Sequence, residues 1–403
     1  MTRPAQRPMR ALPVLEGRRD ALEKCVFCPK LCRSACPVSN AEPRETITPW
    51  GKMSLAWMAA HGDVPADRSH AAPAWACTGC FACRESCDHR NVVADVLIEA
   101  RDALAEVGVG PPGARRAAAR FGHHEARTRL AARALASRSP SGGTGTRRGA
   151  SDALLVGCGY LRAAPREAAD ALAAATALAG GPVDVVDRCC GLPLLLAGDA
   201  HGFAAQARDV ARSLADRSRV FVADAGCAQA LKQRYAGAGI ELRARIETLV
   251  EAAASALDRL HPVGDGASPA ERVRWHDPCQ LGRGLGVYEA PRLVLTRALG
   301  RAPEELDDRR ERSICSGAGG LLPATMPDVA RGIADSRLDA HGRAGGGRIV
   351  TACASSLVAL RRAARRARRV TGSRVEVDDL VTWIARALAP VAPAAGPRPP
   401  SSP

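Results

Sequence analysis

Short apolar runs alternate with amphipathic stretches over roughly the C-terminal two thirds of the chain. Buried strands are predicted at the apolar runs 153–156, 183–186, 220–223, 273–276 and 348–351. Helical periodicity follows these runs: one stretch spans 165–179 and starts with proline, and others begin near Pro291 and after Ala352. Strands that alternate with helices form parallel sheets with helices packed on their faces, so this part of the chain is predicted to be α/β.

The α/β part consists of two segments that repeat one another. In each, a cysteine follows the first strand, a Cys-Cys-Gly or Cys-Ser-Gly string comes next, and another cysteine follows a later strand. The offset from Cys190 to Cys227 is 37 residues, and the offset from Ser316 to Cys353 is also 37. This agreement of cysteine, glycine and strand indicates a duplicated module.

The N-terminal part contains eight of the fifteen cysteines, in two runs between Cys25 and Cys87. Three thiolates in a tight turn can bind three corners of a 4Fe-4S cubane, and in two-cluster ferredoxins the fourth cysteine of each run binds the other cluster. The predicted ligands are therefore Cys25, Cys28, Cys32 and Cys87 for one cluster, and Cys77, Cys80, Cys83 and Cys36 for the other.

Zinc is the alternative metal for these thiolates. It favours two well-separated Cys-x-x-Cys pairs that close one tetrahedral site. Four cysteines within residues 77–87 suit a cubane better. The N-terminal part is thus predicted to be a helical, ferredoxin-type domain whose two 4Fe-4S clusters carry single electrons.

Stretches rich in Gly, Ser, Arg and Pro separate these parts, including a short break at 262–270. The tail is too rich in proline to fold and is expected to be disordered. The predicted division is a two-cluster domain at 16–136, a linker at 137–150, cysteine-rich α/β domains at 151–261 and 271–388, and a disordered tail at 389–403.

The formal net charge is +15 over 403 residues. Only four of the 57 basic residues are lysine, and this heavy use of arginine, beside so much alanine and glycine, indicates genomic base composition. Nucleic-acid binders more often interleave aromatic and basic groups, whereas aromatics make up 3% here, so no nucleic-acid partner is expected. A basic face that steers an acidic redox partner fits the charge better.

No run of 18 apolar residues occurs, so no transmembrane segment is predicted, and any membrane association would be peripheral and through a partner. Residues 1–19 are basic without the apolar core of a signal peptide. The expected compartment is the cytoplasm, where thiols stay reduced and free to bind metal.

Six strings in the repeated segments resemble the paired motifs of the cysteine-rich CCG domain. They are GCGY (157–160), CCGLP (189–193) and GCAQAL (226–231), then HDPCQLGR (276–283), CSGAGG (315–320) and TACASSL (351–357). A two-cluster ferredoxin domain followed by two CCG domains is similar to the D-type subunit of heterodisulfide reductase. The iron–sulfur subunits of glycolate oxidase and of anaerobic glycerol-3-phosphate dehydrogenase share this plan, as do lactate-utilisation proteins. The resemblance covers residues 25 to about 388.

In that family a complete copy has a lone cysteine, Cys-Cys-Gly and Cys-x-x-Cys, and it can bind a further iron–sulfur cluster. Here Ala230 replaces the last cysteine of the first copy, and Ser316 and Ser356 replace two in the second. Four thiolates could still hold a cluster in the first copy, whereas three in the second would need an outside ligand. The alternative is that these cysteines are buried and inert. The residues in question are Cys158, Cys189, Cys190, Cys227, Cys279, Cys315 and Cys353.

The resemblance implies an electron-transfer subunit that relays electrons from a flavoprotein dehydrogenase, acting on a 2-hydroxy acid or similar substrate, to a quinone or other acceptor. No flavin or nicotinamide fingerprint occurs in the chain, so hydride chemistry would belong to a partner. The alternative is a catalytic disulfide reductase of the heterodisulfide type, with an iron–sulfur active site in the CCG domains. His276 is a candidate proton donor, although its place beside Asp277 favours a structural role.

Overall fold

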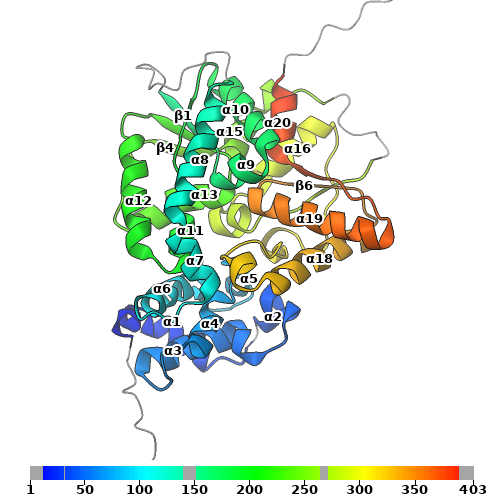
Figure 1. The fold of residues 1–403 in the computed structure, drawn as a ribbon. Coiled ribbons are helices and arrows are strands. Elements are labelled where there is room, and N and C mark those ends of the chain that lie inside the picture. The colour runs from blue at the N-terminus through cyan, green and yellow to red at the C-terminus, as the bar shows by residue number, and fades with distance from the viewer. Residues whose placement is uncertain (1–11, 31, 139–150, 264–270, 390–403) are drawn as a thin grey trace, which may run out of the picture.

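The computed structural model describes residues 12–30, 32–138, 151–263 and 271–389. Figure 1 shows a helical N-terminal part in blue and cyan, and two sheet domains in green and in yellow to red. Most of the predicted linker, of the predicted tail and of the break between the sheet domains lies outside the described residues. The domain boundaries placed in these segments therefore remain predictions.

The N-terminal part consists of short helices around a small apolar core. In α3 (Pro49–His61), Thr48 accepts a hydrogen bond from the Gly51 amide, and Gly62 ends the helix with φ of 76°. Residues that fill the core are Leu22, Met53, Trp75, Val96 and Leu97. The other elements are η1 (Pro13–Arg18), α1 (Arg19–Val26), η2 (Arg33–Ala35), α2 (Pro37–Ala41), η3 (Glu45–Ile47), α4 (Arg68–Trp75), α5 (Ala82–Glu85), α6 (Val93–Glu106), α7 (Pro112–Ala119) and α8 (Phe121–Ala136).

The first sheet domain has four parallel strands in the order β2-β1-β3-β4. The strands are β1 (Asp152–Leu155), β2 (Asp184–Val185), β3 (Arg219–Val222) and β4 (Arg245–Thr248). Its helices are α9 (Cys158–Ala163), α10 (Pro165–Ala179), α11 (Leu192–Ala197), α12 (Ala200–Ser213), α13 (Ala225–Gln229), η4 (Ala230–Arg234), α14 (Tyr235–Gly237), α15 (Leu249–Ala254) and η5 (Leu257–Arg259).

The second sheet domain has three parallel strands in the order β5-β6-β7, with an isolated parallel bridge between Arg274 and Glu304 at the edge beside β5. The strands are β5 (Val273–Trp275), β6 (Arg348–Thr351) and β7 (Val377–Asp379). Its helices are η6 (Gln280–Gly284), α16 (Glu289–Leu299), η7 (Arg310–Arg312), α17 (Leu322–Thr325), α18 (Pro327–Arg343), α19 (Ala354–Thr371) and α20 (Leu380–Leu388).

The two sheet domains share one hydrophobic core and pack with approximate two-fold symmetry. The helix α10 of the first packs on α20 of the second, and the equivalent pair α15 and α16 packs in the same way. Trp275 and Trp383 are buried in this shared core. The helix α8 contributes Ala132 and Leu135 to it, so the last helix before the predicted linker is built into the sheet domains.

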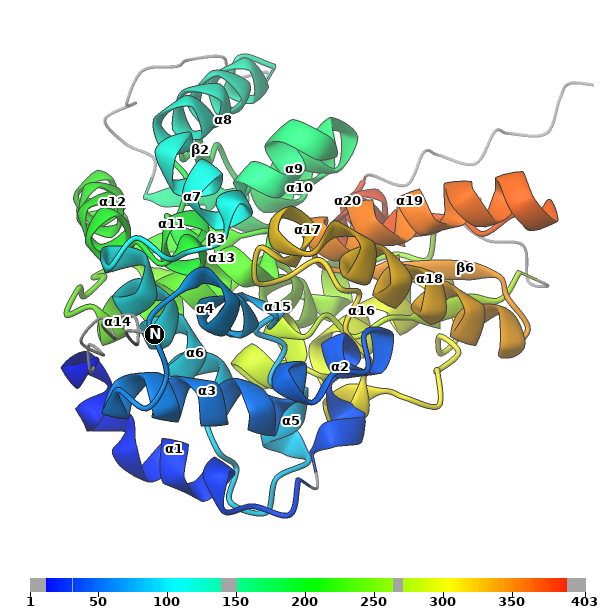
Figure 2. The same cartoon turned by 60° about the horizontal axis from the view of Figure 1, so that its bottom comes forward.

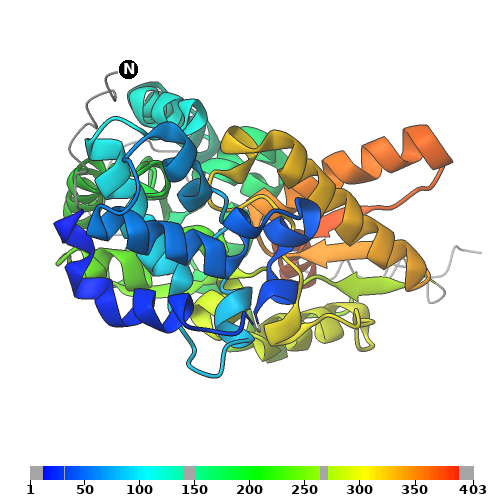
Figure 3. The same cartoon turned by 90° about the horizontal axis from the view of Figure 1, so that it is seen from below.

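The N-terminal helices lie across one side of both sheet domains (Figures 2 and 3). The buried side chain of Arg101, on α6, joins all three parts. Its guanidinium donates to the carbonyls of Ala74 at 2.9 Å and Cys77 at 2.8 Å within the N-terminal part. It also donates to Leu196 at 3.3 Å in the first sheet domain and to Gly320 at 3.2 Å in the second. Burial lowers the pKa of Arg101 to about 10.

The predicted fold class is confirmed: a helical N-terminal region precedes two α/β domains with parallel sheets. Each of the five predicted strands overlaps an observed strand, and α10 has the predicted bounds. The strands β4 and β7 were not predicted, because each lies at the edge of its sheet and contains charged residues. No helix in the described residues is both long and apolar enough to cross a bilayer.

Candidate metal centres

The first predicted ligand set gathers at the end of α1. The thiol of Cys25 interacts electrostatically with those of Cys28, Cys32 and Cys87, although Cys87 lies far along the chain. Burial raises the pKa of Cys25 to about 12. The Asn91 amide donates to Cys25 Sγ at 3.0 Å. The structure thus places the fourth cysteine of the second run beside the first run.

The second predicted ligand set lies where the N-terminal part packs against the second sheet domain. Burial raises the pKa of Cys83 well above its ordinary value, and the neighbouring thiols of Cys77, Cys80 and Cys36 raise it further. The buried side chain of Lys52 donates from Nζ to Cys36 Sγ at 3.5 Å. Burial disfavours the Lys52 cation, but the adjacent sulfur atoms outweigh this effect and raise its pKa.

The chemistry of these donors fits two iron–sulfur clusters. All fifteen cysteines lie in the described part of the chain, and none is paired in a disulfide. Each N-terminal set offers four soft sulfur ligands and a buried nitrogen donor, from Asn91 or Lys52, aimed at a sulfur. A buried cation and N–H donors stabilise an anionic cluster bound by thiolates.

The four cysteines of the first sheet domain form one chain of contacts. The thiol of Cys158 interacts with that of Cys189, Cys189 with Cys190, and Cys190 with Cys227. The neighbouring Cys189 thiol lowers the pKa of Cys158 to about 6. Four adjacent, largely buried thiols form a set of soft metal ligands. Ala230, at the position of the missing cysteine, is fully buried.

The cysteines of the second sheet domain are arranged differently. Cys315 packs against Cys279 and also against Cys80, which belongs to the second N-terminal set. The neighbouring loop docks on the same region, because Gln280 Nε2 donates to the Gly79 carbonyl at 2.9 Å and Arg283 Nε to the Cys80 carbonyl at 2.6 Å. Two thiols of the second copy therefore line the predicted site of an N-terminal cluster.

The remaining motif positions of the second copy carry no thiol except Cys353. Ser316 and Ser356, which stand where the family has cysteines, hydrogen-bond to each other across 2.9 Å and are buried. Cys353 lies beside Ser356 and Asp224. Asp224 accepts hydrogen bonds from the Gly226 amide at 2.9 Å and the Ala354 amide at 3.0 Å, so it joins the two copies.

A cavity of about 290 Å³ lies between the two copies. Residues of the N-terminal part, including Thr78 and Gly79, also line it. The cysteines in its wall are Cys158, Cys190 and Cys227 from the first copy, and Cys279, Cys315 and Cys353 from the second. Thiols from both halves of the duplication thus face one cavity.

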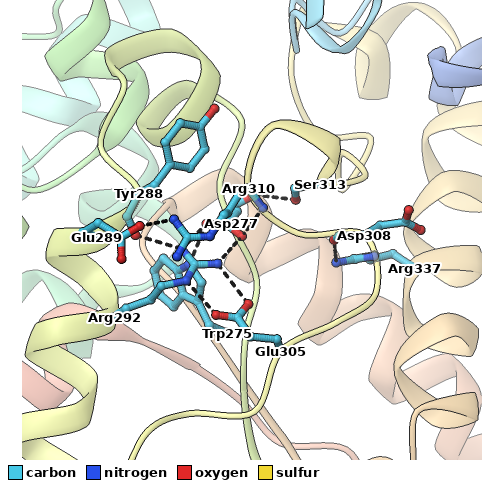
Figure 4. A network of polar contacts seen from close by, with 10 residues as sticks. All are labelled: Trp275, Asp277, Tyr288, Glu289, Arg292, Glu305, Asp308, Arg310, Ser313 and Arg337. Atoms are coloured by element: carbon cyan, nitrogen blue, oxygen red, sulfur yellow. Dashed lines mark hydrogen bonds and ion pairs between the residues drawn. The ribbon is translucent and has the colours of Figure 1, made fainter. Parts of the chain in front are cut away.

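Within the HDPCQLGR string, Asp277 has a structural role, and Figure 4 shows its polar contacts. Asp277 accepts hydrogen bonds from Trp275 Nε1 at 2.9 Å, from Arg292 Nη1 at 2.8 Å and from the Arg310 amide at 2.8 Å. His276 is buried, and burial lowers its pKa to about 3. A histidine that is neutral at physiological pH and fully enclosed suits a structural role, as its position beside a strand predicted.

Several residues beside the cysteines were missed from the sequence. Lys52 and Asn91 carry no local motif, and their roles come from the tertiary packing that buries them against sulfur. His124, on α8, was also missed: one of its ring nitrogens and the sulfurs of Cys158 and Cys189 all lie within 4.8 Å of one another. Its position in a helix before a low-complexity stretch gave no signal of such a neighbourhood.

Comparison with known families agrees with the division into an N-terminal part and two sheet domains. Residues 21–91 match the family of 4Fe-4S dicluster domains, and residues 153–232 and 273–361 match the cysteine-rich CCG domain. The chain is therefore an iron–sulfur protein with a dicluster domain, which implies two 4Fe-4S clusters, and a duplicated cysteine-rich domain.

Its curated relatives agree with the resemblance drawn from the motifs. The D subunit of dihydromethanophenazine:CoB–CoM heterodisulfide reductase from Methanosarcina mazei is 35% identical over 161 residues, which is 37% of this chain and 38% of that protein. The B subunit of fumarate reductase (CoM/CoB) from Methanothermobacter marburgensis is 26% identical over 351 residues, 82% of this chain and 66% of that protein. The matches to the D subunits of heterodisulfide reductases span between 38% and 49% of the length of those proteins.

Proposed function

We propose that the chain is the iron–sulfur electron-transfer subunit of an oxidoreductase, with the eight N-terminal cysteines as ligands of two clusters. It would take electrons from a flavoprotein dehydrogenase of a 2-hydroxy acid or similar substrate and pass them to a quinone or other acceptor. The observation that carries the proposal is the contact of Cys80 and Cys315, which brings one N-terminal thiol set against the cavity between the two copies. Clusters bound at such sites exchange one electron at a time.

The residues around the thiols support a relay of electrons. Lys52 and Asn91 donate to sulfur, and such hydrogen bonds tune the reduction potential of a bound cluster. Arg101 holds the loop at Cys77 against both sheet domains, so the distance between the sites stays fixed. The relatives are named as subunits, which supports a partner that carries the flavin. We propose the cytoplasm as the compartment, with membrane association only through that partner.

A second candidate is the reduction of a disulfide at the cavity. Six cysteines in one cavity wall, and relatives named as heterodisulfide reductase subunits, favour it. The balanced step takes a disulfide, two electrons and two protons to two thiols. Two one-electron centres in the N-terminal part could supply both electrons.

The test reduces the anaerobically purified chain with dithionite, removes the reductant, and mixes the protein with either a soluble quinone or a small disulfide. The return of iron–sulfur absorbance measures reoxidation. Reoxidation by the quinone alone supports the relay. Reoxidation by the disulfide, with two thiols released per disulfide and loss of that activity in Cys190→Ala, supports the second candidate. If neither acceptor reoxidises the protein and an added flavoprotein dehydrogenase cannot reduce it, the proposed function is wrong.

A further inference from the structure

The side chain of His124 points from α8 toward the thiols of the first copy. One ring nitrogen of His124 and the sulfurs of Cys158 and Cys189 lie within 4.8 Å of one another. The Nε2 atom of His124 is buried and has no hydrogen-bond partner among the described residues. A buried imidazole nitrogen without a partner is costly unless something binds to it.

The helix α8 is fixed at this place by its next residue. Glu125 accepts from the Cys189 amide at 3.0 Å through Oε2, and from Gln206 Nε2 at 3.1 Å through Oε1. Gln206 Nε2 also donates to the Cys189 carbonyl at 2.9 Å. One turn of α8 therefore holds the backbone of Cys189 through Glu125 and places His124 beside the Cys189 side chain.

We propose that His124 is the fifth ligand of a third iron–sulfur cluster, held with Cys158, Cys189, Cys190 and Cys227. This inference rests on the proposed function, since it adds a redox centre to the same subunit. The four thiols form one continuous chain of contacts, and His124 extends that chain at its Cys158 end. Ala230 leaves the copy one thiolate short, so His124 supplies a fifth donor from outside the motif.

Imidazole suits this position chemically. It is a good ligand for iron, and a neutral imidazole in place of a fifth thiolate leaves a cluster less negative and with a higher reduction potential than five thiolates would. The chain thus carries a centre that differs in ligation from the two all-cysteine N-terminal sites.

Binding of the cluster through His124 Nε2 also changes the contact between His124 and Arg162. Arg162 Nη1 contacts His124 Nδ1, where a ring with its proton on Nε2 accepts a hydrogen bond. A ring that binds metal through Nε2 carries its proton on Nδ1, so it can no longer accept there. The Arg162 side chain is exposed, and it is free to turn into solvent when the cluster is present.

The experiment compares the full chain, purified anaerobically with ¹⁵N-labelled histidine, with the variants His124→Gln and His123→Gln. His123 is the neighbouring, exposed histidine on the same helix, and so it is the matched control. Pulsed EPR on the reduced protein reads the hyperfine coupling between histidine nitrogen and a cluster. The expected coupling is present in the wild type and in His123→Gln and is lost in His124→Gln.

Iron counts and potentials give two further measurements. We expect about twelve iron atoms per wild-type chain, four in each of three clusters. In His124→Cys, which offers thiolate instead of imidazole, the third cluster remains and its midpoint potential falls. The N-terminal cluster signals, unchanged in each variant, report that the protein is folded.

Three results would overturn the assignment of His124. They are a wild-type protein without histidine coupling, a wild-type protein with about eight iron atoms and intact N-terminal signals, and zinc without sulfide at this site. None of them decides the proposed function, because the chain could still exchange electrons with a quinone or disulfide through its N-terminal clusters. Conversely, a chain that shows the coupling, but is neither reoxidised by either acceptor nor reduced by an added flavoprotein dehydrogenase, keeps the ligand and loses the function.

Discussion

The two copies of the cysteine-rich domain share a run of three parallel strands, β1-β3-β4 in the first and β5-β6-β7 in the second, but use their cysteines in different ways. In the first, four thiols contact one another in series and His124 stands at one end. In the second, Cys279 and Cys315 meet Cys80 of the N-terminal part, and two serines pair with each other. The two copies thus share a scaffold, whereas the contacts of their cysteines depend on the residues that pack around each copy.

This difference indicates that the two copies have different roles. The first copy retains four adjacent thiols, which are soft donors that suit metal binding. The second copy has a serine pair that satisfies its own hydrogen bonds, so that half of its motif needs no metal. Two of its thiols, Cys279 and Cys315, lie between the predicted N-terminal cluster site at Cys80 and the shared cavity.

The largest expected effect separates the copies by their iron content. Cys190→Ala removes a central thiol of the first copy, and we expect iron to fall from about twelve to about eight atoms per chain. Cys353→Ala removes a buried thiol of the second copy and should leave about twelve. Iron and acid-labile sulfide assays on anaerobic protein measure both. Equal losses in the two variants would contradict the comparison.

A smaller effect distinguishes the equivalent ends of β4 and β7. Thr248 ends β4 and caps α15, whereas Asp379 ends β7, caps α20 and accepts from the Tyr160 hydroxyl of the first copy at 2.6 Å. Burial raises the pKa of Asp379 to about 7, against the opposing effect of the Tyr160 hydrogen bond. Between about pH 4 and pH 7 the folded state therefore holds a proton that the unfolded chain has released.

It follows that the free energy of unfolding contributed by Asp379 decreases as pH rises through this window. Asp379→Asn should remove the decrease, so that the variant gains on the order of 2–3 kcal/mol relative to wild type between pH 5 and pH 8. Anaerobic thermal unfolding at the two pH values measures the gain. Asp216→Asn, an exposed change, should show no such difference. A variant that follows the wild-type pH profile would argue against a buried, protonated Asp379.

The smallest effect concerns the serine pair. Ser316→Ala leaves the buried Ser356 hydroxyl without its partner and should lower the free energy of unfolding by about 1–2 kcal/mol. The double change Ser316→Ala with Ser356→Ala removes both hydroxyls, and should cost less than the sum of the single changes. Iron content should stay constant in all three variants. Loss of iron in any of them would show that the serines take part in metal binding.

The sequence was sufficient for the fold class because strand and helix periodicities are local and the second copy repeats the first. It also yielded two ligand sets for the N-terminal cysteines, from the exchange of the fourth cysteine between the runs of two-cluster ferredoxins, and that assignment stays a prediction. It could not reveal the contact of Cys80 with Cys315, because docking of separate domains depends on packing rather than on local pattern. For the same reason His124 gave no signal: its neighbours Cys158 and Cys189 lie beyond a low-complexity stretch.

The contacts of Arg101 also bear on how the protein is made. Its four carbonyl partners come from three parts of the chain, and the last of them, at Gly320, lies 219 positions further on. At a synthesis rate of about 5–20 residues per second, roughly 10–40 s pass between the translation of Arg101 and that of Gly320. During this interval the second sheet domain is incomplete and cannot cover the face of the N-terminal part that contains Cys77. The contacts of Arg101 with all three parts of the chain are therefore completed only late in synthesis.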